Sequence, residues 1–91
     1  MPIDSAEAFQ ISERAIATTT AYEHLKSACR KAQRHNIPLR PHIKAWWNQG
    51  KTGRANTSDL EQYKSMLAAI IQDAGQHIDL KSATHWLKAN S

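Results

Sequence analysis

The sequence has little cysteine, and it lacks a long apolar run. The single cysteine, Cys29, has no partner in the chain, so no intrachain disulfide can form. Small secreted domains usually depend on disulfides, and the first residues contain neither the basic nor the apolar stretch of a secretory signal. We therefore expect a cytoplasmic protein. No run of about 18 apolar residues occurs, so we expect no membrane-spanning segment.

Strand patterns are also lacking. β-branched residues nowhere alternate with polar ones, and there are only three prolines and three glycines, too few for a fold made of strands and tight turns. Apolar residues make up 41% and charged residues 22%, which is ordinary for a folded domain and unlike disordered chains. The 91 residues predict a single all-α domain over residues 1–91. A chain of this length rarely encloses a deep substrate pocket, which favours a shallow binding surface or a pocket formed by oligomerisation.

A long first helix is expected over residues 6–34. Apolar and small residues recur there at alternating spacings of three and four, which is typical of one helix face. That stripe consists of Ile11, Ala15, Thr18, Tyr22, Leu25, Cys29 and Ala32. The β-branched run 18–20 favours a bend or a break, and Pro38 ends the helix. The stripe is longer than two short helices can cover, so it could also pair with a second copy as a homodimer.

Three further helices complete a compact bundle of about four. Pro41 suits the first turn of a short helix over residues 41–48, and Gly50 suits its C-terminal cap. Ser58 and Glu61 have the spacing of a capping box before a long helix over residues 59–74, and Thr57 is a rival cap. Asp79 is expected to cap a short helix over residues 80–89. The residues expected to face inward on the last two helices are Leu60, Tyr63, Leu67, Ile70, Ile71, Ala74, Leu80, Ala83 and Leu87.

Basic residues are concentrated in one part of the chain. Residues 24–58 contain no Asp or Glu, although the whole chain has a net charge of +4. The basic residues of this segment are Lys26, Arg30, Lys31, Arg34, Arg40, Lys44, Lys51 and Arg54. Lys26, Arg30 and Arg34 are four residues apart, so we expect them to share one helix face that points to solvent, opposite the apolar stripe. The remaining residues could extend the same surface around the short helix and the following loop.

The basic segment suggests two functions. Lys and Arg displace counterions from nucleic acid, and Arg can bind phosphate with two donors, so the first hypothesis is a non-enzymatic protein that binds the phosphate backbone. The alternative is an adaptor or inhibitor that docks on an acidic or nucleic-acid-handling protein complex. Trp46 is expected to be partly exposed, where it could stack on a base or anchor a protein interface, and Trp47 beside Ile43 is expected in the core.

Motifs for catalysis, metals and cofactors are not found. The five histidines form neither an H-x₃-H pair nor an HExxH motif, and Cys29 lies on the apolar stripe, where a buried thiol is the expected state. The loop from Gly50 to Arg54 contains glycine and basic residues but lacks the spacing of a nucleotide-binding P-loop. We therefore expect no catalytic residue, no metal and no cofactor.

Overall fold

A computed structural model describes the backbone of residues 5–49 and 55–91, and the side chains of residues 13–49, 55–56 and 58–91. These segments form four α-helices, α1 (Ser5–Arg34), α2 (Pro41–Asn48), α3 (Leu60–Ala74) and α4 (Lys81–Ala89), with a 3₁₀ turn, η1 (Thr57–Asp59), before α3. The described segments contain no strand. The predicted all-α bundle of four helices is therefore confirmed. None of the described helices is both long and apolar enough to cross a bilayer.

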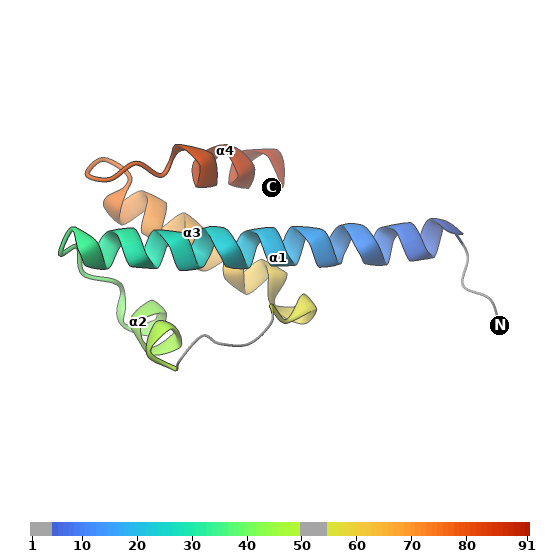
Figure 1. Cartoon of the computed structure of the whole chain (residues 1–91), viewed down its shortest axis with the longest axis horizontal. Helices are drawn as coiled ribbons and strands as arrows, with labels where there is room; N and C mark the ends of the chain where they lie inside the picture. Colours follow the sequence, from blue (N-terminus) through green and yellow to red (C-terminus); the bar gives the residue numbers. More distant parts are fainter. Residues whose placement is uncertain (1–4, 50–54) are drawn as a thin grey trace.

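The long helix α1 is the axis of the fold. Figure 1 shows α3 crossing α1, with α2 and α4 on opposite sides of the long helix. The buried residues that α1 and α3 share are the centre of the core, and they include most of the two predicted stripes. On α1 the buried side chains of that stripe are Thr18, Tyr22, Leu25, Cys29 and Ala32. Ala21 and Ala28 are also buried, because small side chains beside the stripe allow neighbouring helices to approach closely.

Helix α1 is continuous through the three threonines, so the sequence's open question of a break there is answered in the negative. The Thr18 hydroxyl donates to the Arg14 carbonyl oxygen at 2.7 Å, and the Thr20 hydroxyl donates to the Ile16 carbonyl oxygen at 2.8 Å. Hydrogen bonds of this kind satisfy threonine within a helix. Thr18 is fully buried, so its hydrogen bond offsets the cost of removing a hydroxyl from water.

The end of α1 sets the direction of α2. Asn36 has a φ of 58°, and the Ile37 N–H donates to the Ala32 carbonyl oxygen at 2.8 Å. This is the Schellman arrangement, with asparagine in the left-handed position that often follows a helix. The chain therefore reverses after Arg34, and Ile37 packs on the core before α2 begins.

The starts of the last two helices differ in how well they were predicted. The Ser58–Glu61 capping box is wrong, because the Asn56 side-chain oxygen accepts hydrogen bonds from the Ser58 N–H at 3.1 Å and from its hydroxyl at 2.8 Å. The Asn56 cap holds η1, so α3 begins at Leu60. Leu80, not Asp79, occupies the N-cap position of α4, but the Asp79 carboxylate accepts a hydrogen bond from the Lys81 N–H at 3.1 Å in the first turn of that helix. The predicted cap at Gly50 lies outside the described residues.

Candidate nucleic-acid interface

A cluster of three aromatic side chains and one buried isoleucine packs α2 against the rest of the fold. The Trp46 ring meets Tyr22 of α1 edge-on, with 6.0 Å between ring centroids, and it lies 6.1 Å from Tyr63 of α3. Tyr22 and Tyr63 stack on each other at 5.3 Å. Ile43, one turn earlier on α2, is fully buried. These contacts hold α2 alongside α1, so the basic residues of the two helices can contribute to one surface.

Arg30 and Trp47 make a direct link between the two helices. The guanidinium carbon of Arg30 lies 5.9 Å from the centroid of the Trp47 ring, within the range of a cation–π contact. Lys44 is three residues before Trp47 and shares its side of α2, and Arg34 is one turn after Arg30 on α1. Arg30, Arg34 and Lys44 are exposed, and Trp47 is half-buried. We call these four residues the α1–α2 face.

The structure corrects the expected exposure of Lys26. Only 15% of its side chain is exposed; its Nζ lies 3.3 Å from the Glu23 carboxylate and 4.6 Å from the centroid of the Tyr22 ring. A step of four residues advances about 40° around a helix, so Lys26 lies close to the buried stripe whereas Arg34 lies farther from it. Lys26 therefore borders the α1–α2 face, and Glu23 offsets its charge.

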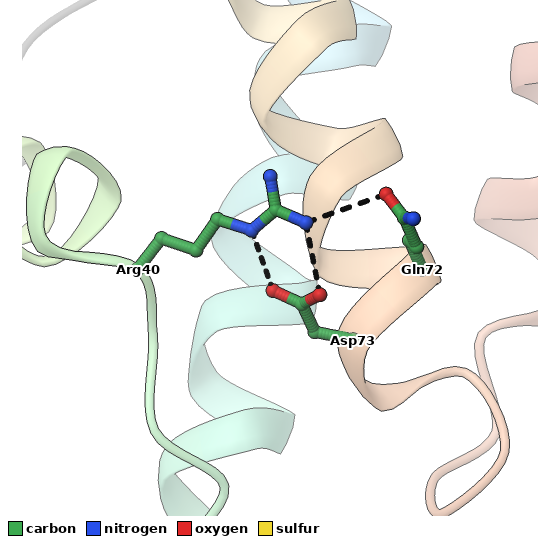
Figure 2. A network of polar contacts seen from close by, with 3 residues as sticks. All are labelled: Arg40, Gln72 and Asp73. Atoms are coloured by element: carbon green, nitrogen blue, oxygen red, sulfur yellow. Dashed lines mark hydrogen bonds and ion pairs between the residues drawn. The ribbon is translucent and has the colours of Figure 1, made fainter.

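Arg40 points away from this face, toward α3. Figure 2 shows its guanidinium in a bidentate contact with the Asp73 carboxylate, to which Nε donates at 2.7 Å and Nη2 at 3.0 Å. Nη2 also donates to the Gln72 side-chain oxygen at 3.3 Å. The hydrogen bonds and charge of Arg40 lower the pKa of Asp73, and those of Asp73 raise the pKa of Arg40. The pair ties the start of α2 to the end of α3, so Arg40 is better suited to a structural role than to phosphate binding.

Lys31 is also directed elsewhere. Its Nζ donates to the Asp79 carbonyl oxygen at 2.9 Å, just before α4. Seven residues earlier on the same side of α1, the His24 ring lies 5.7 Å from the Trp86 ring of α4. Lys31 and His24 therefore belong to the contact between α1 and α4, on a different side of α1 from Arg30.

Trp46 is partly exposed as expected, but Trp47 is not a core residue. Both are half-buried and packed against the core, Trp46 within the aromatic cluster and Trp47 beneath Arg30. Helical spacing could not show which tryptophan is the more buried, because the buried Ile43 projects from α2 at an angle between those of Trp46 and Trp47. The predicted site residues Lys51 and Arg54 lie outside the described residues.

The described side chains contain no metal-binding cluster. Among them no group of three or more His, Cys, Asp or Glu is placed to hold a metal ion. Burial raises the pKa of the Cys29 thiol to about 12, so the reactive thiolate is scarcely populated near neutral pH. The buried cysteine predicted from the stripe is confirmed.

His24 should make stability depend on pH. Burial and the nearby charge of Lys31 lower its pKa from the ordinary value of 6.5, so the folded chain binds the proton less tightly than the unfolded chain. Neutral His24 contributes its full stability above pH 6.5, the ordinary pKa. That contribution is lost as the pH falls from 6.5 through the lowered pKa of the folded chain. We expect the melting temperature to fall in this window, and to fall less in His24→Gln. An equal pH dependence in both proteins would contradict this account.

Known proteins give no independent indication of what the α1–α2 face binds. Comparisons of the whole chain with protein-family models, with curated proteins and with solved structures find no significant match.

Proposed function

We propose that this protein binds nucleic acid without catalysing a reaction, and that its α1–α2 face meets the phosphate backbone. The observation that carries the proposal is the contact of Arg30 with Trp47, which joins the basic residues of α1 to those of α2. The segment that builds the face contains no Asp or Glu between residues 24 and 58, so it brings no repelling carboxylate of its own. We further infer a cytoplasmic location, where nucleic acid would be accessible.

The chemistry of the face suits phosphate more than bases. Arg30 and Arg34 are four residues apart, about 6 Å along the helix axis, and each guanidinium can present two parallel donors to phosphate oxygens. Lys44 adds a cation from the neighbouring helix, and we propose that Lys51 and Arg54, which lie outside the described residues, add further cations to the contact. Backbone contacts carry no direct sequence information, so we expect binding with little sequence preference.

Salt dependence is the test of this function. Binding that neutralises phosphates releases counterions, so the logarithm of the affinity should fall linearly with the logarithm of salt concentration. Three to five contacts would give a slope of roughly −3 to −4.5 on duplex DNA, at about 0.9 per contact. Fluorescence anisotropy with labelled single-stranded and duplex oligonucleotides measures this slope. If neither the single-stranded nor the duplex oligonucleotide binds detectably at low salt, the proposal is refuted.

A protein partner with an acidic surface is the second candidate. The half-buried Trp46 and Trp47 beside Arg30 favour it, because tryptophan and arginine are the residue types most enriched at the centres of protein interfaces. In this case the protein would be an adaptor or inhibitor of an acidic or nucleic-acid-handling complex. Capture of one stoichiometric protein that survives nuclease treatment supports this second function. Capture that is lost on nuclease treatment supports nucleic-acid binding.

A further inference from the structure

Helix α1 leaves apolar surface uncovered around Ile16. Ile16 is 67% exposed, and no other large hydrophobic side chain among those described is classed as exposed. Helix α1 has 30 residues and α3 has 15, or about 45 and 22 Å at 1.5 Å per residue. Figure 1 accordingly shows α1 extending well past the start of α3. From Glu13 onward, Thr18 is the first side chain of α1 that is fully buried.

A groove lies beside Ile16 on the same surface. It has a volume of about 600 Å³, and it is lined by Ala17 and Thr20 of α1, Leu60 of α3 and Trp86 of α4, with Glu13 and Arg14 also lining it. Trp86 is half-buried, so part of its ring faces the groove and its surroundings. The surface thus combines a projecting isoleucine with a neighbouring concave site whose walls are apolar at Ala17, Leu60 and Trp86 and polar elsewhere.

We propose that a second copy of this chain occupies the groove, with α1 antiparallel to its own counterpart. A two-fold interface uses the same patch on both copies, and a projection next to a hollow is self-complementary under that symmetry. Ile16 of each copy enters the groove of the other and packs between Leu60 and Trp86. Both surfaces lose their exposed apolar area in this arrangement.

Charge favours a second copy over a strongly acidic or basic partner. Glu13 and Arg14 are adjacent at the groove, and Lys64, another residue that lines it, lies 3.8 Å from the Glu61 carboxylate. The patch is therefore close to neutral and does not repel an identical patch. The α1–α2 face is basic throughout and would repel itself.

The dimer leaves the α1–α2 faces open. Arg30 is 14 residues after Ile16, about 21 Å along α1, so the two faces lie toward opposite ends of the antiparallel pair. The dimer does not depend on the proposed function, because no residue of the α1–α2 face takes part in it. Helical turns without tertiary contacts are only marginally stable in water, so pairing also stabilises the first turns of α1.

Light scattering after size exclusion tests the dimer. The wild-type chain should have the mass of two 10.2 kDa chains, and Ile16→Glu should reduce that mass to one chain. Gln62→Glu is the matched control, because it adds the same charge at an exposed position on the other side of α3 and should leave the dimer intact. Circular dichroism should show similar helix content in both variants, since Ile16 is exposed in the single chain.

Two results would overturn the proposal. The first is a wild-type chain that stays monomeric at the highest soluble concentration. A groove that binds a different protein would give this same result. The second is a dimer that persists in Ile16→Glu, which would place the interface elsewhere. Should Ile16→Glu fail to fold, Ile16→Ala replaces it, with an expected increase of at least tenfold in the dimer dissociation constant.

Discussion

The double substitution Arg30→Glu with Arg34→Glu is expected to abolish measurable nucleic-acid binding. Each arginine would lose charge-assisted hydrogen bonds to phosphate worth about 1.5 kcal/mol or more, and each new carboxylate would repel phosphate. Two such losses weaken affinity by at least about 100-fold before repulsion is counted. Fluorescence anisotropy at low salt would measure the change. Folding should be retained, because both side chains are exposed on α1.

The control for this variant must change the net charge by the same amount elsewhere. Lys81→Glu with Lys88→Glu does so on α4, where both side chains are exposed and lie away from α2. If the α1–α2 face is the binding surface, this control should lose far less affinity than the double arginine variant. Equal losses in the two proteins would mean that net charge alone drives the binding, and the proposed site would be wrong.

Leu25→Ala should destabilise the fold by about 3 kcal/mol. Leu25 is fully buried in the middle of α1, where the long helix packs on α3. Removing a buried leucine side chain loses its transfer free energy and leaves a cavity that rigid helices fill only in part, with typical costs of about 2 to 5 kcal/mol. For a domain of this size the melting temperature should fall by roughly 15 °C. Thermal unfolding followed by circular dichroism measures it.

Gln33→Ala serves as the matched comparison for Leu25→Ala. It also truncates a side chain of α1 to alanine, but Gln33 is exposed, and substitutions at such positions usually change stability by less than about 0.5 kcal/mol. A similar fall in melting temperature for both variants would mean that the interface between α1 and α3 is not the centre of the core. Urea unfolding provides the same comparison as a free energy.

Periodicity was enough to predict the helices, because each one buries a single face. The stripes on α1 and α3 predicted buried residues such as Leu25 and Leu67, and the helix bounds agree closely with the structure. Local choices were harder to predict. Thr18 to Thr20 have low helix propensity, but buried packing and two side-chain hydrogen bonds outweigh it. The cap of η1 was missed because Asn56 and Ser58 are both good capping residues, and only the fold decides between them.

The candidate site depends on contacts between residues distant in the sequence, so composition predicted it only in part. The absence of acids in residues 24–58 located the basic segment, but Arg40 meets Asp73 from α3, which lies outside that segment. The contact of Arg30 with Trp47 required knowing how α2 folds back along α1. Helical spacing placed Arg30 and Arg34 together, but it could not show that Lys26 is largely covered beside Tyr22.

The most direct measurement is an NMR titration of the ¹⁵N-labelled protein with a short oligonucleotide at low salt. The chain has three tryptophans, so their indole N–H signals report separately on α2 and α4. The account predicts that the indole signal of Trp47 and the backbone amides around Arg30, Arg34 and Lys44 shift together on binding, while the indole signal of Trp86 stays in place. Shifts confined to Trp86 and α4, or none at all, would contradict binding at the α1–α2 face.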